Sequence, residues 1–196
     1  MTKLIAEIGW NFLGDLNLAK KMIKEAKDNG ADLIKTQIFS VKNLKPGPWD
    51  NDGRREIYLK SELTDKKFKV LFDYAKKLKI DFFASALNKD GVDILRKYQT
   101  KYIKIASAES RNYNLIKYAS KYFKNIIIST GATKYSEIIK LFKKNIKKSK
   151  IILLHCNSSY PCNYKKLNLP RIDKLKKLSK KVGFSDHSPG IYGSVL

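Results

Sequence analysis

Six apolar runs of this sequence end on polar residues that can bind ligands or transfer protons. A short buried strand has no use for a lysine, glutamate or histidine unless that side chain faces a shared polar site, because burying such a group unpaired costs several kcal/mol. Parallel strands bring their carboxyl ends together, and ligands bind there. The repeated pattern therefore predicts a ligand site built from strand ends. Its candidate residues are Glu7 and Asn11, Lys35 and Gln37, Lys104, Ser107 and Glu109, Ser129, His155, and Ser185 and His187.

The elements that must position these residues form an alternating series. Asp15 can cap a helix that carries Leu18, Met22 and Ala26 on one stripe and stops at Gly30. Strands that alternate with helices of about 10 to 15 residues indicate right-handed βαβ units and a parallel sheet. The predicted class is therefore α/β. The expected strands are 4–9, 33–39, 81–87, 102–107, 126–130, 151–155 and 182–186, and the expected helices are 15–29, 65–79, 89–98, 112–123, 135–146 and 171–180.

One connection is longer than a simple turn. Residues 46–53 contain Pro46, Gly47, Pro48 and Gly53, which disfavour regular structure. Long loops beside strand ends are frequently functional. We expect this segment to be an active-site flap.

The composition favours a globular, cytoplasmic protein. Of the 196 residues, 43% are hydrophobic, and no apolar run approaches the roughly 18 to 20 residues of a membrane span. The net charge of +23 raises nucleic acid as a partner. However, the basic residues are mostly lysines spread over all helical segments, which is typical of a solvated helix ring that also concentrates anionic substrates. We expect neither nucleic acid nor a membrane as partner, and we expect Cys156 and Cys162 to be free thiols.

Six strings of residues together resemble one family, the sialic acid synthases, which includes the N-acetylneuraminate, legionaminate and pseudaminate synthases. The resemblance runs from about residue 4 to the last residue, and the strings occur in the same order as in the family. They are Ala6-Glu7-Ile8-Gly9-x-Asn11, Lys35-Thr36-Gln37, Tyr102-Ile103-Lys104-Ile105-Ala106-Ser107-x-Glu109, Ile128-Ser129-Thr130-Gly131, Leu153-Leu154-His155-Cys156 with Ser158-Ser159-Tyr160-Pro161, and Ser185-Asp186-His187.

The resemblance implies a reaction and a set of roles. The family condenses phosphoenolpyruvate with the aldehyde of an N-acetylated hexosamine, such as N-acetylmannosamine, to give a nine-carbon 2-keto acid and phosphate. Lysines and hydroxyls suit the anionic ends of phosphoenolpyruvate. Glu109 matches the family's acid–base residue, and Glu7 is either a second catalytic acid or an ion-pair partner of Lys35. The residues expected to bind phosphoenolpyruvate are Lys35, Lys104, Ser107, Ser129 and Ser185, and those expected to bind the sugar are Gln37, Tyr160 and Asn11.

The resemblance also implies a divalent metal, Mn²⁺ or Mg²⁺, held by two histidines. His187 matches the first ligand, and the second belongs to an eighth strand that lies beyond Leu196. His155 matches a strand-six position and is expected to be either a residue behind the site or a satisfied core histidine. Phe12 and Ser158 replace residues that are common in the family, which bears on sugar preference.

The implied fold is a (β/α)8 TIM-type barrel that ends after strand seven. We expect residues 1–196 to be one incomplete synthase barrel without the family's C-terminal antifreeze-like domain, to have impaired activity alone, and to act on small molecules, with a homodimer as an open option. Two alternatives remain: a 3-deoxy-aldulosonate-type synthase that also uses phosphoenolpyruvate, and a non-catalytic barrel that only binds a ligand or a partner.

Overall fold

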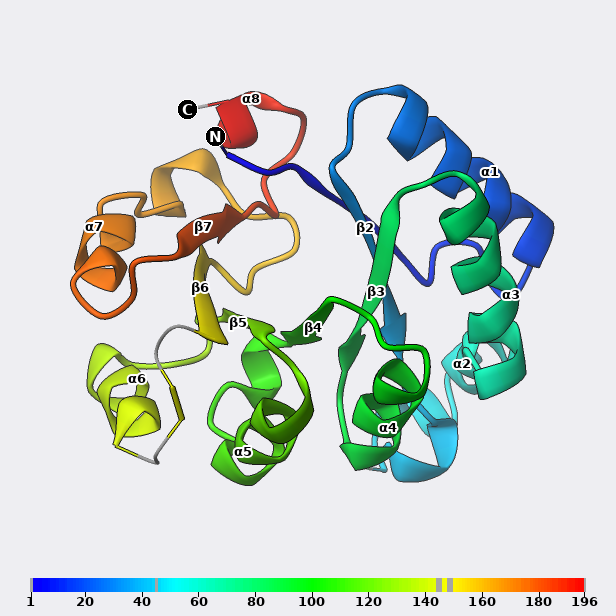
Figure 1. Cartoon of the computed structure of the whole chain (residues 1–196), viewed down its shortest axis with the longest axis horizontal. Helices are drawn as coiled ribbons and strands as arrows, with labels where there is room; N and C mark the ends of the chain where they lie inside the picture. Colours follow the sequence, from blue (N-terminus) through cyan, green and yellow to red (C-terminus); the bar gives the residue numbers. More distant parts are fainter. Residues whose placement is uncertain (1, 45, 144–145, 148–149, 196) are drawn as a thin grey trace. The chain divides into compact units, whose positions relative to one another are not determined.

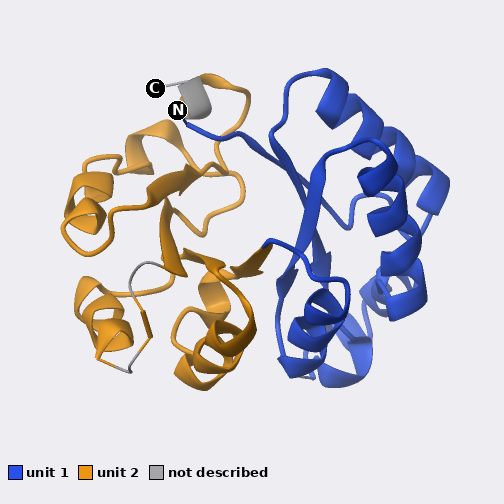
Figure 2. Cartoon of the chain, viewed as in Figure 1, with its two compact units in different colours: residues 1–101 blue, residues 102–196 orange. Residues whose placement is uncertain are grey.

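Figure 1 shows the computed structural model of the chain, which describes residues 2–44, 46–143, 146–147 and 150–195. The chain divides into two compact units, residues 1–101 and 102–196, which are coloured separately in Figure 2. Each unit consists of parallel strands in chain order with helices between them, so the predicted α/β class is confirmed. Within the described residues, no helix is both long enough and apolar enough to cross a membrane.

The described residues of unit 1 form three parallel strands. Strand β1 (Ile5–Gly9) pairs with β2 (Leu33–Ile38), and β2 pairs with β3 (Asp81–Ala86). Helices α1, α3 and α4 contact these strands, and α1 also packs against α3. The helical elements of the unit are α1 (Leu16–Asp28), η1 (Val41–Asn43), η2 (Pro48–Asp50), α2 (Arg54–Ser61), α3 (Asp65–Lys77) and α4 (Lys89–Lys97).

The described residues of unit 2 form four parallel strands, β4 (Tyr102–Ile105), β5 (Asn125–Ser129), β6 (Ile151–Cys156) and β7 (Val182–Ser185). Ile126, Ile127 and Ile128 at the centre of β5 are all buried, as is usual for strands of parallel sheets. The helical elements are η3 (Ser107–Glu109), α5 (Tyr113–Tyr122), α6 (Tyr135–Phe142), η5 (Tyr164–Lys166), α7 (Arg171–Lys176) and α8 (Tyr192–Val195).

Side-chain caps explain where several helices begin. The Asp15 carboxylate accepts hydrogen bonds from the backbone N–H groups of Asn17 and Leu18 at 2.8 and 3.1 Å, as the sequence predicted. Asn88 and Asn112 cap α4 and α5 in the same way. These caps fix the points at which the chain leaves the preceding strand and turns back along the sheet.

The structure differs in four places from what the sequence predicted. Helix α2 was not predicted, because Arg54–Ser61 has little apolar pattern and buries only Ser61. The predicted flap at 46–53 contains the short helix η2 among its described residues. The helix expected over 171–180 ends at Lys176; beyond its end, the Ser179 hydroxyl turns inward and donates to the Ile151 carbonyl at 2.9 Å. The helix expected over 135–146 ends at Phe142, and positions 144–145 lie outside the described residues.

Candidate functional site

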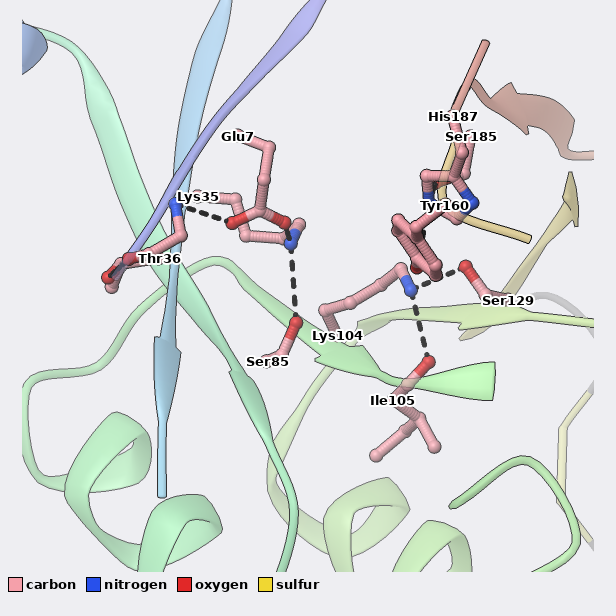
Figure 3. A network of polar contacts seen from close by, with 11 residues as sticks. Glu7, Lys35, Thr36, Ser85, Lys104, Ile105, Ser129, Tyr160, Ser185 and His187 are labelled. Carbon is pink, nitrogen blue, oxygen red and sulfur yellow. Dashed lines mark hydrogen bonds and ion pairs between the residues drawn. The ribbon is translucent and has the colours of Figure 1, made fainter. Parts of the chain in front are cut away.

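In unit 1, a buried lysine lies between a carboxylate and a hydroxyl. Lys35 on β2 is 8% exposed, and its ammonium forms an ion pair with Glu7 on β1, the partner that the sequence analysis had left as one option. The same ammonium donates to Ser85 Oγ on β3 at 3.3 Å (Figure 3). Glu7 and Lys35 are register partners on neighbouring strands. The protein thus supplies the counter-charge that a buried ammonium requires.

Three predicted polar residues gather around Gly9, at the carboxyl end of β1. Gly9 has a φ of +54°, and a Cβ placed on it would lie 3.6 Å from Glu7 Oε1, 3.8 Å from Gln37 Nε2 and 4.0 Å from Asn11 Oδ1. The Gly9 N–H also donates to Glu7 Oε1 at 2.8 Å. Because glycine adopts this conformation without strain and adds no side chain, the polar atoms of Glu7, Gln37 and Asn11 converge on one place.

In unit 2, a second buried lysine is held by a hydroxyl and a backbone carbonyl. Lys104 on β4 is 6% exposed and donates to Ser129 Oγ on β5 at 2.5 Å and to the Ile105 carbonyl at 3.2 Å. Across the described residues, no carboxylate forms an ion pair with it. Burial lowers the pKa of Lys104 from 10.5 to about 8, because removal from water disfavours the charged form. A cation in this state attracts an anionic ligand.

Ser107 lies in a second donor-rich part of unit 2. Its hydroxyl accepts a hydrogen bond from the Ala132 backbone N–H at 3.1 Å and lies 3.4 Å from Cys156 Sγ. Gly131 allows this approach, since a Cβ there would lie 2.7 Å from Cys156 Sγ and 2.5 Å from Ser158 Oγ. The glycine that follows Ser129-Thr130 in the predicted motif therefore has a steric reason to be there.

A third group of predicted residues meets around His187. The His187 Nδ1–H donates to the Asn157 carbonyl at 2.6 Å, since a carbonyl can only accept. In the neutral tautomer Nε2 carries the lone pair, and this atom lies 3.1 Å from Tyr160 Oη and 3.5 Å from Ser185 Oγ. The Tyr160 and His187 rings are 4.1 Å apart, so these predicted residues form one cluster (Figure 3).

The described residues around His187 do not supply the set of ligands that the expected metal ion needs. Nε2 of His187 is oriented as a ligand nitrogen, but the described residues contain no group of three or more His, Cys, Asp or Glu side chains that could hold a metal ion. One imidazole is insufficient for tight binding, because selective sites use several ligands. We therefore derive no reaction step through a metal.

Two other predicted residues have local roles. The Glu109 carboxylate accepts a hydrogen bond from Asn112 Nδ2 at 2.8 Å, at the start of α5. His155 is 2% exposed and donates from Nε2 to the Leu167 carbonyl at 2.6 Å, while its Nδ1 has no partner in the described part of the chain. Burial lowers the pKa of His155, which favours the neutral ring. This neutral ring lies in the buried interior of unit 2.

Sequence reasoning missed several contributors to these clusters. Ser85 holds Lys35, the Asn157 carbonyl fixes the His187 tautomer, and the Ala132 N–H orients Ser107. A signal existed only for Ser85, which interrupts the apolar run Phe82-Phe83-Ala84-Ser85-Ala86. Backbone donors and acceptors carry no sequence signal, since every residue has them.

Taken separately, each cluster suits a different task. Lys104 with its serine is suited to an anion, and the polar atoms around Gly9 are suited to hydroxyl or amide groups of a neutral ligand. The geometry therefore supports binding of small, polar, partly anionic molecules at strand ends.

Comparison with known proteins identifies the family. A model of the NeuB family matches residues 22–196. The chain belongs to the NeuB family. It is 38% identical over 210 residues to the N,N'-diacetyllegionaminic acid synthase of Campylobacter jejuni, a match that covers 99% of this chain and 63% of that protein. It is 33% identical over 207 residues to the pseudaminic acid synthase of the same organism, with 98% of this chain and 60% of the relative covered.

The similarity extends to three-dimensional structure. The crystal structure of N-acetylneuraminic acid (sialic acid) synthetase from Leptospira borgpetersenii serovar Hardjo-bovis in complex with citrate matches with a TM-score of 0.85 and 36% identity, covering 96% of this chain and 66% of that one. The resemblance to the sialic acid synthases is thus confirmed. The NeuB chain described here spans about three fifths of the length of the curated relatives it matches.

Proposed function

We propose that this NeuB-family chain binds phosphoenolpyruvate and an N-acetylated amino-sugar aldehyde, and that its residues serve their condensation to a nine-carbon 2-keto sugar acid. In that reaction, C3 of phosphoenolpyruvate forms a bond with the aldehyde carbon, water adds at C2, and phosphate leaves. The relatives are named as synthases of N,N'-diacetyllegionaminic acid and pseudaminic acid, and the condensation reaction is what the resemblance to the sialic acid synthases implies. We also propose that residues 1–196 form a single domain and that this domain is part of a (β/α)8 barrel.

The observation that carries the proposal is the environment of Lys104. A buried ammonium without a carboxylate partner is unfavourable unless an anion completes it. Ser129 supplies a hydroxyl at the same place, and phosphoenolpyruvate has a phosphate and a carboxylate that accept such donors. We assign Lys104, Ser129, Ser107 and Ser185 to phosphoenolpyruvate, whereas the ammonium of Lys35, which the family motif also assigns to this ligand, is already neutralised by Glu7.

The remaining assignments concern the sugar and the proton transfers. Glu7, Gln37 and Asn11 present polar atoms around Gly9 and suit the hydroxyl and amide groups of the acceptor. We assign Tyr160 to the acceptor as well. We assign acid–base catalysis to Glu109, with Glu7 acting mainly through its ion pair with Lys35.

The first test is binding of phosphoenolpyruvate, measured by calorimetry. Replacement of Lys104 by Met should weaken binding by about 1.5 to 3 kcal/mol, the usual range for a hydrogen bond to a charged group. Lys117→Met is the matched control, because it removes the same charge from an exposed position on α5. Equal affinity of both variants would contradict the assignment.

The second test is turnover, followed by phosphate release in the presence of phosphoenolpyruvate and N-acetylmannosamine. Glu109→Gln should lower the rate about a hundredfold while phosphoenolpyruvate affinity stays the same. Binding of both ligands without phosphate release would support the alternative of a barrel that only binds. Failure to bind phosphoenolpyruvate would contradict the proposed function.

A further inference from the structure

Unit 1 contains an aromatic cavity of about 270 Å³, and the assignments above give its aromatic residues no ligand. Four aromatic rings line it, those of Trp10, Phe39, Trp49 and Tyr58. Tyr58 lies at the centre, with ring centroids 5.6 Å from Trp10, 6.2 Å from Phe39 and 5.5 Å from Trp49. We call this cavity, together with its other lining residues Gln37, Leu44 and Leu87, the aromatic pocket.

The aromatic pocket lies at the same edge as the polar residues around Gly9. Trp10 follows β1 directly, and Phe39 and Leu87 directly follow β2 and β3, so three strand ends form its base. The other wall comes from Trp49 in η2 and Tyr58 in α2, the two helical segments that were not predicted. The pocket is therefore part of the ligand edge of unit 1.

The wall that carries Trp49 is held in place before any ligand arrives. Asp50 accepts a hydrogen bond from the Gly47 N–H at 3.1 Å and forms an ion pair with Arg55 at 2.7 Å. The Arg55 guanidinium lies over the Trp49 ring, 5.8 Å from its centroid. Such ordering lowers the entropy that a ligand must overcome on binding.

Gln37 connects this pocket to the polar cluster. Its side chain lines the aromatic pocket, while its Nε2 lies 3.8 Å from the position of a Cβ on Gly9, near Glu7 and Asn11. A ligand that extends from the cluster into the pocket must therefore change from polar to apolar within a few bonds. An N-acyl group on a sugar has this character, since its amide is polar and its methyl end is apolar.

The charges of the molecule exclude the main alternative occupant. Rings around a cavity can also hold a cation. However, none of the described residues that line the cavity is acidic, and the chain has a net charge of +23, which repels cations. A neutral apolar group is the occupant that agrees with both observations.

We propose that the aromatic pocket binds the N-acyl group of the amino-sugar acceptor, with Gln37 on the amide and Trp10, Trp49 and Tyr58 around the alkyl end. This inference rests on the proposed function, because it names the part of the acceptor that unit 1 recognises. A water molecule occupies about 30 Å³ in the liquid, so a cavity of about 270 Å³ has room for an acyl chain longer than acetyl. The pocket should therefore accept such chains and bind them more tightly.

The experiment uses the protein's own fluorescence. Trp10 and Trp49 are the two tryptophans of the sequence, and both line the pocket, so emission reports on it directly. Mannosamine, N-acetylmannosamine and N-propanoylmannosamine are titrated into the chain. We expect saturable changes with the two N-acyl sugars, about three- to fourfold tighter binding for the added methylene, and no saturable change with mannosamine.

Two variants distinguish binding in the aromatic pocket from unspecific effects of a substitution on sugar binding. Trp49→Ala should weaken N-acetylmannosamine binding about tenfold or more and remove the preference for the propanoyl sugar, with Trp10 as the remaining reporter. Leu59→Ala, at an exposed position of the same helix α2, should change neither. If Trp49→Ala does not fold, Trp49→Phe should retain binding with a reduced preference for the longer acyl chain.

Two outcomes would overturn the inference: equal binding of acylated and unacylated sugars, or an unchanged acyl preference in the Trp49 variants. Calorimetry with phosphoenolpyruvate distinguishes this failure from failure of the proposed function. Phosphoenolpyruvate binding without acyl selectivity would refute the pocket assignment alone. Acyl selectivity without phosphoenolpyruvate binding would support the pocket and refute the proposed reaction.

Discussion

Lys35 in unit 1 and Lys104 in unit 2 are two versions of one local arrangement. Lys35 pairs in register with Phe83, and its ammonium binds Ser85, two residues further along β3. Lys104 pairs with Ile127, and its ammonium binds Ser129, again two residues further along the next strand. Side chains two residues apart share a face of a strand, so the repeated spacing places a lysine and a serine together in each unit.

The two versions differ in their counter-charge. Lys35 has Glu7 on the neighbouring strand β1, whereas no carboxylate within the described part of the chain pairs with Lys104. An ammonium that is already neutralised adds little to anion binding, and one that is not must gain its partner from a ligand. The comparison assigns a structural task to Lys35 and a ligand-binding task to Lys104, in contrast to the equal roles that the family motifs suggest.

The largest expected effect comes from removing the counter-charge in unit 1. Glu7→Gln leaves a buried ammonium without its carboxylate and should reduce the free energy of unfolding by about 2 to 3 kcal/mol, less than the 3 to 5 kcal/mol typical of a fully buried pair, because the Glu7 side chain is 41% exposed. Urea unfolding measures this change. Asp28→Asn, which breaks the exposed pair with Lys24, is the control and should leave the free energy of unfolding nearly unchanged.

Lys104→Met should act in the opposite direction. A pKa lowered from 10.5 to about 8 corresponds to a penalty of about 3 kcal/mol for the charged form, at 1.36 kcal/mol per pH unit. After the loss of the hydrogen bond to Ser129, a net stabilisation of about 2 kcal/mol at pH 7 is expected. The unfolded chain keeps the proton up to about pH 10.5, so the gain should fade between pH 8 and 10.5. Urea midpoints at pH 7 and 10.5 test both points, and destabilisation at pH 7 would end the contrast with Lys35.

Anion binding should follow the charge of Lys104. Below pH 8 the ammonium is protonated and affinity for phosphoenolpyruvate should be nearly constant, since its phosphate is already largely ionised at pH 7. Above pH 8 the affinity should fall by up to about tenfold per pH unit. Calorimetry from pH 7 to 9.5 measures this, and the slope should be absent in Lys104→Met. A slope that persists in that variant would place the titrating group elsewhere.

The smallest expected effects separate the two serines. Ser129→Ala removes a direct partner of Lys104 and should weaken phosphoenolpyruvate binding by about 1 kcal/mol. Ser85→Ala should leave that affinity unchanged, because Lys35 retains Glu7. Titrations of both variants with phosphoenolpyruvate measure the two affinities. Equal losses would show that both lysines hold the anion.

The sequence determined the class of the fold and the identity of the candidate residues. Alternation of apolar runs with capped helices is a local signal, so the strands and the cap at Asp15 could be predicted, and ordered motifs were enough to indicate the family. Helix α2 could not be predicted, because Arg54–Ser61 lacks an apolar stripe.

Only the tertiary structure decided which of these residues act together. Whether a buried lysine has a carboxylate depends on the register of neighbouring strands, which brings Glu7 to Lys35, and a sequence does not state register. The aromatic pocket likewise joins strand ends to η2 and α2, with rings from positions 10 to 58. The charge and the shape of a site depend on residues that are distant in the sequence, so both are defined only after the chain has folded.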